Sequence, residues 1–464
     1  MQRGAPRDAP RRVSDTLPAP TDRVLWTVAA IIFVAMCLGG GGVRYGLNNL
    51  VVQLCALGFL AFYRDTFLGF WRRAPLALKA LVLASLALPV LQLVPLPEAI
   101  WSALPGRTLA ADARAAIGEI GWASLSLDSA RTLVALSGLI VPVTILGLGW
   151  AISRDQIHWL GWLVVAFGLI NLLAGTGQVV SSEELTSFYP ETSMPGVLFG
   201  AFANRNSTGL FLVAGLTFAS LLPSPRIHPL VGPARIAVCV LLLLAIILTQ
   251  SRTALALSLV PLLLVGAKLA LESRRQSSHG YAGNQRSWLI GLGTFGALAL
   301  AAGLLALAPG RLSETLDRFN SDANPRAYIW EDALYSSKRY WPVGSGMGTF
   351  DEVFQVDESL ENMTQRRAGR AHNDYIEVAI EGGLVGVALI VAWLALWGWL
   401  TWRARSSSQR WVAWSGSAIL LTIALQSITD YPLRNQTMLA VGAIALLLLA
   451  RCGSTAGVDE ENDQ

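Results

Sequence analysis

Long apolar runs separated by short polar segments fill most of the chain. Most of these runs are close in length to a membrane-spanning helix, which needs about 20 residues to cross the hydrocarbon core of a bilayer. We expect membrane-spanning helices near residues 24–39, 47–63, 76–94, 133–152, 157–180, 207–222, 234–250, 253–271, 288–309, 384–402, 411–429 and 437–449. The pattern predicts an all-α polytopic membrane protein with about twelve transmembrane helices.

The polar segments between these runs differ in charge on the two sides of the predicted membrane. If the N-terminus is inside, every inner segment contains Arg or Lys, from the five arginines before residue 24 to Arg451 after the last run. Inner loops of bacterial membrane proteins are basic, so the charge pattern and the number of spans agree. We therefore expect a cytoplasmic N-terminus over residues 1–23 and a cytoplasmic tail over 451–464.

Two long segments fall on the predicted outer side. The first, Pro95 to Arg131, is expected to form an interfacial helix and a short turn. The second, residues 310–383, separates nine predicted spans (24–309) from three (384–450) and is long enough for a small folded unit. Within it, residues 330–340 have the pattern of an amphipathic helix, and the glycines of residues 342–348 indicate turns.

Composition excludes several classes of protein. Of the 464 residues, 53% are hydrophobic and 14% are charged, which is not the balance of a soluble globular domain. The net charge of +4 comes from basic residues scattered between apolar runs, so we expect no nucleic-acid binding. Three of the four cysteines lie inside apolar runs, and their spacing matches neither a disulfide framework nor a metal site.

The most informative polar stretch, residues 370–386, runs from the large outer segment into an apolar span. His372 precedes a predicted helix that Asn373 or Asp374 can cap and that Gly382 and Gly383 interrupt. Histidine exchanges protons near neutral pH, which makes His372 a candidate catalytic base. The alternative is that His372 is an ordinary surface or capping residue.

Two arginines lie at predicted outer ends of spans. Arg205 stands just before the sixth span, where we expect Asn206, Ser207 or Thr208 as the N-cap, and an arginine beside a helix N-terminus can bind an anion. Arg252 lies in a turn so short that Gln250 and Ser251 must form it. Each arginine has an alternative role as an anchor among lipid headgroups.

A third outer segment contains Asp430 and Arg434, which are spaced closely enough to pair with each other. That pairing is the simpler interpretation of the segment.

Together these stretches resemble a known family. Phe202-Ala-Asn-Arg-Asn206, Gln250-Ser-Arg252, Ala371-His-Asn-Asp-Tyr375 with Glu381-Gly-Gly-Leu-Val-Gly386, and Asp430-Tyr-Pro-Leu-Arg434 are similar to the ordered motifs of the O-antigen ligase and polymerase superfamily. The resemblance extends over about residues 196–436. It implies a GT-C-like membrane glycosyltransferase that uses neither a cofactor nor a metal.

The resemblance also assigns roles to residues. It implies that Arg205 and Arg252 bind the donor diphosphate and that His372 is the catalytic base. Asn204, Asp374, Glu381, Asp430 and Arg434 match supporting positions, and Asp374, Glu377 or Glu381 remain alternatives for orienting the His372 imidazole. A leaving diphosphate needs fixed positive charge, which two arginines can supply.

The implied donor is a glycan on undecaprenyl diphosphate at the periplasmic face of the bacterial inner membrane. The acceptor is lipid A-core for a ligase, or another lipid-linked repeat unit for a polymerase of O-antigen or exopolysaccharide; other polysaccharide-export proteins are candidate partners. The motifs favour a polymerase slightly, and a protein O-oligosaccharyltransferase is a further member of the superfamily. The alternative from another class is a polysaccharide transporter or lipid flippase, which the number of spans also fits.

Overall fold

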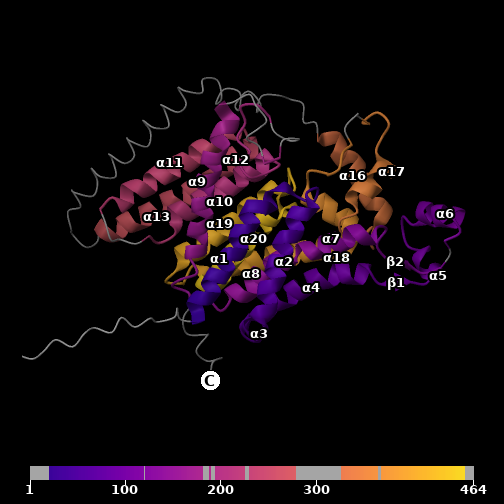
Figure 1. Cartoon of the computed structure of the whole chain (residues 1–464), viewed down its shortest axis with the longest axis horizontal. Coiled ribbons are helices and arrows are strands. Elements are labelled where there is room, and N and C mark those ends of the chain that lie inside the picture. Colours follow the sequence, from indigo (N-terminus) through magenta and orange to yellow (C-terminus); the bar gives the residue numbers. More distant parts are fainter. Residues whose placement is uncertain are drawn as a thin grey trace, which may run out of the picture.

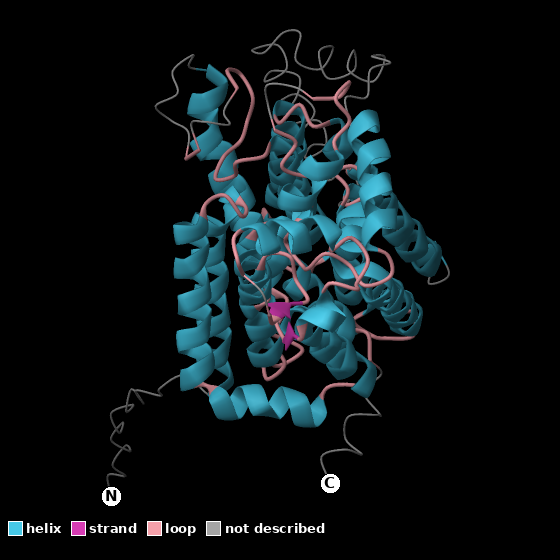
Figure 2. Ribbon diagram, turned by 90° about the vertical axis from the view of Figure 1, so that its right-hand side faces the viewer, coloured by secondary structure: helices cyan, strands magenta, loops and turns pink. Residues whose placement is uncertain are grey.

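The computed structural model describes residues 20–119, 121–180, 188–189, 194–224, 229–277, 326–363 and 367–454. These residues are mostly helical, and the strands among them are β1 (Pro95–Leu96) and β2 (Ala123–Ser124), which pair antiparallel (Figures 1 and 2). The helices are α1 (Pro20–Leu38), α2 (Gly46–Phe62), α3 (Arg64–Arg73), α4 (Leu76–Gln92), α5 (Glu98–Trp101), α6 (Thr108–Ala116), α7 (Ser129–Gly138), α8 (Ile140–Gly149), α9 (Trp159–Val180), α10 (Arg205–Leu221), α11 (Val231–Leu248), α12 (Arg252–Leu257), α13 (Leu259–Ser277), α16 (Ala327–Tyr340), α17 (Phe350–Asp357), α18 (Asp374–Ala404), α19 (Arg410–Gln426) and α20 (Gln436–Cys452).

Six stretches of helix among the described residues are long and apolar enough to cross a membrane, and the bent pair α2 and α3 would make a seventh. The six are Asp22–Gly41, Ser129–Gly149, Trp159–Val179, Val231–Leu248, Arg252–Glu272 and Asp374–Ala404. Helices α4 and α20 are apolar but have 17 residues each. The predicted span at 288–309 lies outside the described residues. The all-α polytopic class is confirmed, and the number twelve stays a prediction.

The core of the bundle is built around α10 and α20. Both helices are buried along most of their length, α20 packs against α8 and α19, and α10 packs against α9 and α11. Apolar burial on all sides is expected for a helix at the centre of a membrane bundle. The two helices therefore fix the positions of the loops that precede them, residues 194–204 and 427–435.

The start of α1 and the end of α20 lie near the same loop. Gln156 in the loop before α9 donates a hydrogen bond to Asp22 (2.6 Å), and Arg154 donates to the carbonyl of Ser454 (3.3 Å). The first and last described helices thus have these ends on one side of the bundle.

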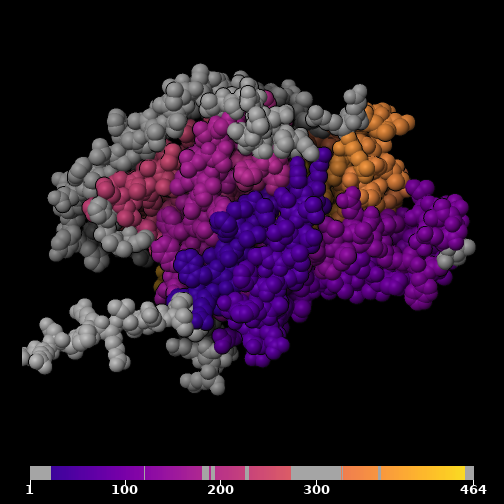
Figure 3. Space-filling model, in the orientation of Figure 1, coloured from indigo at the N-terminus to yellow at the C-terminus, as the bar shows by residue number. Residues whose placement is uncertain are grey.

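At the other end, two segments distant in sequence form a joined unit (Figure 3). One contains β1, α5, α6 and β2; the other contains α16, α17 and the turns between them. The fully buried Arg107 guanidinium donates from Nη2 to the carbonyls of Leu125 (2.6 Å) and Gly344 (2.9 Å), and the Leu127 amide donates to Ser345 (2.9 Å). Burial lowers the pKa of Arg107 to about 10, so the side chain stays charged at neutral pH.

Helix α18 is broken where the sequence predicts an interruption. Gly383 has φ of 56°, outside the helical region. The glycine-rich segment 342–348 docks at this break: Ser345 donates to the Ile380 carbonyl (2.9 Å), and the Leu384 amide donates to Pro342 (2.8 Å). Backbone groups that the break would leave unpaired are satisfied in this way. These hydrogen bonds therefore attach the segment 342–348 to both parts of α18, before and after the break.

The break yields a first prediction. A Cβ at Gly383 would collide with the Pro342 carbonyl and lie 2.7 Å from the Val343 carbonyl carbon, so Gly383→Ala should lower the free energy of unfolding by about 1 to 3 kcal/mol. Gly398 on the same helix is the control, because a Cβ there meets nothing within 4 Å. The measurement is thermal unfolding of the detergent-solubilised protein, and equal unfolding temperatures for the two variants would contradict the prediction.

Candidate active site

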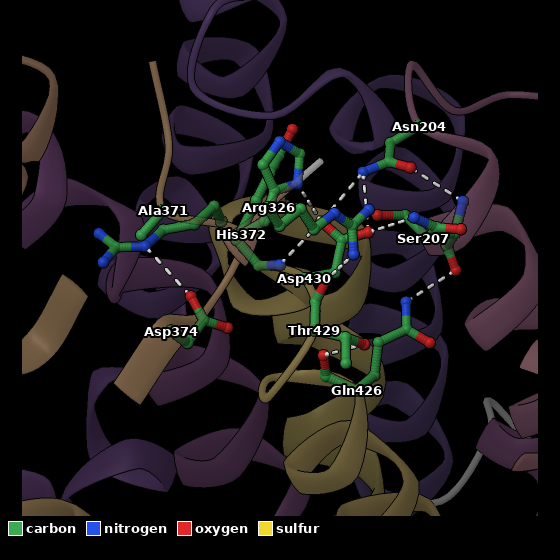
Figure 4. A network of polar contacts seen from close by, with 12 residues as sticks. Asn204, Ser207, Arg326, Ala371, His372, Asp374, Gln426, Thr429 and Asp430 are labelled. Carbon is green, nitrogen blue, oxygen red and sulfur yellow. Dashed lines mark hydrogen bonds and ion pairs between the residues drawn. The ribbon is translucent and has the colours of Figure 1, made fainter. Parts of the chain in front are cut away.

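Polar side chains from three distant segments converge on Asp430 (Figure 4). Its carboxylate lies 3.3 Å from His372 Nδ1, and it accepts hydrogen bonds from the side-chain amides of Asn206 (2.6 Å) and Asn204 (3.3 Å). The Tyr431 amide donates to it as well (3.0 Å). Asp430 is almost fully buried, so these donors replace the water that an ionised carboxylate needs.

The same network reaches the turn that carries Arg252. Ser251 donates from Oγ to the Asn206 Oδ1 (2.8 Å), and its Oγ also caps α12 by accepting from the Ala254 amide. Arg252 is the first residue of α12. The side chains of Ser251, Asn206, Asp430 and His372 therefore form one continuous chain of hydrogen bonds across four motifs of the sequence.

Helix α10 begins earlier in the chain than the sequence predicts. The N-cap is Asn204, whose Oδ1 accepts from the Asn206 amide (2.8 Å), so the expectation of a cap at Asn206, Ser207 or Thr208 is wrong. Asn204 is left with its amide group free to reach Asp430, and Asn206 turns to the centre of the network. Arg205 becomes the first residue of the helix and is partly buried.

Helices α10 and α12 begin close to each other. A Cβ on Gly209 would collide with the Ala254 side chain and lie 3.3 Å from Ser251 Cβ, so the glycine permits close packing of the two helix starts. Each helix N-terminus carries a partial positive charge, and an arginine occupies the first position of each. The structure places Arg205 and Arg252 at neighbouring helix starts that are linked to His372 through Asn206 and Ser251.

His372 is held in an uncommon backbone conformation, with φ of 51°. Its neighbours fix it: the Ala371 amide donates to Glu377 Oε1 (2.9 Å), the Ala371 carbonyl accepts from Trp330 Nε1 (2.9 Å), and Asn373 caps α18 as predicted. The imidazole packs against the Tyr431 ring, with centroids 5.0 Å apart. About a third of the His372 side chain remains exposed, which leaves it accessible to a substrate.

Asp430 is poised to orient the imidazole. Burial raises the pKa of the Asp430 carboxyl, but the hydrogen bond from His372, the electrostatic influence of His372 and Arg326, and the Asn206 hydrogen bond lower the pKa below its usual value. Its contribution to stability is thus present above the ordinary Asp pKa and is lost as pH falls through the lowered pKa. An ionised Asp430 only accepts, so His372 Nδ1 carries the proton of this hydrogen bond.

A second charged cluster surrounds Arg434. Its guanidinium forms ion pairs with Asp374 (3.4 Å), Glu377 (3.0 Å) and Glu381 (3.0 Å), and Glu377 also pairs with Arg370 (3.1 Å). All three carboxylates belong to the short helix of α18 before the break. Arg434 therefore attaches the loop between α19 and α20 to the helix that follows His372.

The structure corrects two expectations about the charged residues around His372. Asp430 and Arg434 do not pair with each other: Asp430 faces His372, and Arg434 faces the acids of α18. Among the carboxylates considered for orienting His372, none of Asp374, Glu377 and Glu381 does so in the structure; Asp430 takes that place. Asp430 and Arg434 lie at the two ends of a short segment that contains the 3-10 helix Pro432–Arg434, and they contact different partners.

Some members of the site have weaker sequence signals. Asn206 and Ser251 lie inside the motifs, but nothing in either motif shows that they contact each other. Arg326 donates to the carbonyl of Thr429 beside Asp430, and it stands at the start of α16 in a segment without a motif.

The Arg434 cluster yields a second prediction. Arg434→Met would leave three buried carboxylates without their shared cation, so it should destabilise the protein by about 3 kcal/mol or more. The control is Arg367→Met, because the Arg367 side chain is 53% exposed and pairs with Asp351 on the surface, where a salt bridge contributes little. Thermal unfolding measures the stability of both variants. An Arg434→Met protein as stable as the control would contradict the stabilising role of Arg434.

Comparison with known proteins adds one match. Residues 237–391 match the model of a family described as O-antigen ligase, which supports the family that the motifs indicate. The match contains the Ser251–Arg252 turn and the His372 segment. Asn204–Asn206 and Asp430–Arg434 lie outside the matched residues but contact them through the hydrogen bonds of Asn206 to Ser251 and of His372 to Asp430. A comparison with curated proteins gave no match.

Proposed function

We propose that this chain, which matches the O-antigen ligase family model over residues 237–391, is a glycosyltransferase of the bacterial inner membrane. It transfers or polymerises a glycan carried on undecaprenyl diphosphate, at the periplasmic face and without a metal. The observation that carries the proposal is the His372–Asp430 pair, linked by hydrogen bonds to the helix starts that bear Arg205 and Arg252.

His372 supplies the base. With Nδ1 held by Asp430, Nε2 takes the proton from the acceptor hydroxyl as its oxygen forms a bond to the anomeric carbon of the donor sugar. The bond from that carbon to the diphosphate oxygen breaks, and the diphosphate leaves with the electron pair. The carboxylate stabilises the imidazolium that forms, and such base catalysis contributes about 10²- to 10⁴-fold in rate.

Arg205, Arg252 and the N-termini of α10 and α12 supply the positive charge. Negative charge grows on the diphosphate as the glycosidic bond breaks, and fixed donors placed there stabilise the transition state more than the ground state. Arginine also binds phosphate oxygens in a bidentate manner. These groups can act without a metal ion.

Ligase and polymerase share this chemistry and differ in the acceptor. The Asn-Arg-Asn element and the closing Asp-Tyr-Pro-Leu-Arg element favour a polymerase that joins lipid-linked repeat units. The same geometry serves transfer to lipid A-core.

A transporter or flippase is the second candidate, and the buried Arg434 cluster favours it. Ionisable groups buried near membrane helices often mark ion or substrate pathways. Against it, the cluster is internally paired and stands beside the His372 segment. The two functions differ in what they require of His372.

The proposal yields a third prediction. In a strain that lacks the gene, His372→Gln should reduce long-chain surface glycan by about 100-fold or more, because the base is lost while the shape is kept. Arg205→Ala and Arg252→Ala should reduce it strongly as well, because the leaving group loses charge stabilisation. The control is His158→Gln, since His158 lies in the loop that contacts Asp22 through Gln156, away from the site.

Glycan is measured by gel, and protein in the membrane by immunoblot. Single repeats left on lipid A-core would indicate a polymerase, and bare core with polymer held on undecaprenyl diphosphate would indicate a ligase. Wild-type glycan in His372→Gln, Arg205→Ala and Arg252→Ala would contradict the transferase and favour the transporter.

A further inference from the structure

Two buried amide side chains on the apolar helix α9 contact the loop that leads into α10, and the two helices pack side by side (Figure 1). Asn171 and Gln178 are 2% and 6% exposed. An amide inside a membrane-spanning helix costs free energy unless it is hydrogen bonded. Neither residue belongs to a motif of the sequence or to residues 237–391, which match the family model.

Both side chains present an oxygen to the backbone of this loop. Gln178 Oε1 accepts from the amides of Phe199 (3.0 Å) and Gly200 (2.9 Å). Asn171 Oδ1 accepts from the Ala201 amide (2.8 Å), while its Nδ2 donates to a carbonyl one turn earlier in α9 (2.8 Å). Three consecutive amides of the loop therefore take their acceptors from one helix.

The same loop also contacts the helices that adjoin the two arginines of the site. The Leu198 amide donates to the carbonyl of Leu248 (3.0 Å), the last residue of α11, just before the tight turn that leads into α12. The Phe199 carbonyl accepts from Thr208 Oγ1 (2.8 Å), in the turn of α10 that begins with Arg205. The loop thus joins the end of α11 to the start of α10.

The loop has little freedom to move. Every backbone amide from residue 198 to residue 203 donates a hydrogen bond, and the last of them donates to the Gly40 carbonyl (3.2 Å). A mostly buried segment whose amides are all paired resists local unfolding. Displacing this loop would therefore require breaking its bonds to α9 first.

We infer that Asn171 and Gln178 are positioning residues, which hold this loop so that Arg205 and Arg252 keep the separation that a lipid diphosphate requires. The inference rests on the proposed binding of a diphosphate by these arginines. A diphosphate has two charged groups at a fixed distance, so two arginines bind both groups only at a matching separation. A monophosphate lacks the second group, so its affinity depends much less on that separation.

A fourth prediction concerns the selectivity between these two ligands. The full-length protein in detergent is titrated with undecaprenyl diphosphate and with undecaprenyl monophosphate, and both dissociation constants are measured. Gln178→Met keeps the side-chain length but loses the acceptor oxygen, so it should weaken diphosphate binding about tenfold and monophosphate binding less than twofold. Gln178→Glu keeps an acceptor and should bind the diphosphate within about threefold of the wild type.

A structural role alone would give a different result. Loss of folded protein lowers the number of sites for both lipids and leaves the ratio of the two dissociation constants unchanged. Thr176→Val on the same helix is the control, because the Thr176 hydroxyl donates only within α9, to the Leu172 carbonyl (2.8 Å), and its ratio should equal that of the wild type.

Asn171→Leu removes the bond to one loop amide, whereas Gln178→Met removes the bonds to two, so it is the milder variant and decides the question if Gln178→Met does not fold. It should weaken diphosphate binding about threefold and leave monophosphate binding unchanged. In the Arg205→Ala protein, which has lost one of the two cations, adding Gln178→Met should not change the ratio further. A wild-type ratio in both Gln178→Met and Asn171→Leu would overturn the inference.

Glycan transfer by the same proteins separates this inference from the proposed function. If the wild type transfers lipid-linked glycan but the ratio does not change in the variants, the positioning role fails and the transferase stands. If the ratio changes as expected but the wild type transfers no lipid-linked glycan, the positioning role stands and the proposed function fails. A wild type that binds the two lipids equally well overturns the inference in either case.

Discussion

The buried carboxylate of Asp430 is the group on which the site depends. A carboxylate removed from water must be met by donors, and here they come from His372, Asn204, Asn206 and the adjacent backbone amide. Those residues lie on three segments separated by up to 226 positions in the chain. Satisfying one charge therefore brings His372 and the start of α10 together, and Asn206 extends the contact to Ser251 and the start of α12.

Arg434, in the same loop as Asp430, fixes the position of the helix that follows His372. Its guanidinium draws Asp374, Glu377 and Glu381 to one side, and these acids fix the short helix that begins directly after His372. Gly383 then allows α18 to break and continue as a long apolar helix. The two buried charges, four residues apart, thus hold His372 from both directions: one through its side chain and the other through the helix that follows.

Local features of the sequence were sufficient to predict several parts of this arrangement. Asn373 as a helix cap, the interruption at Gly382 and Gly383, and the tight turn at Gln250 and Ser251 follow from residue type and spacing within a few positions. The cap of α10 was misplaced because Asn204, Asn206, Ser207 and Thr208 are all competent caps. The partners of Asp430 and Arg434 could not be predicted, because hydrogen bonds and ion pairs over 53 to 226 residues depend on how the helices pack.

We propose that Asp430 and Asn206 act on His372 as one unit, and a double-mutant cycle on the proposed glycan transfer tests this most directly. A hydrogen bond to a charged group is worth about 1.5 to 3 kcal/mol, so Asn206→Ala alone should lower kcat/KM at least about tenfold. Once Asp430→Asn has removed the charge, adding Asn206→Ala should cost little more. If the two losses multiply in the double variant, the residues act independently and the account is contradicted.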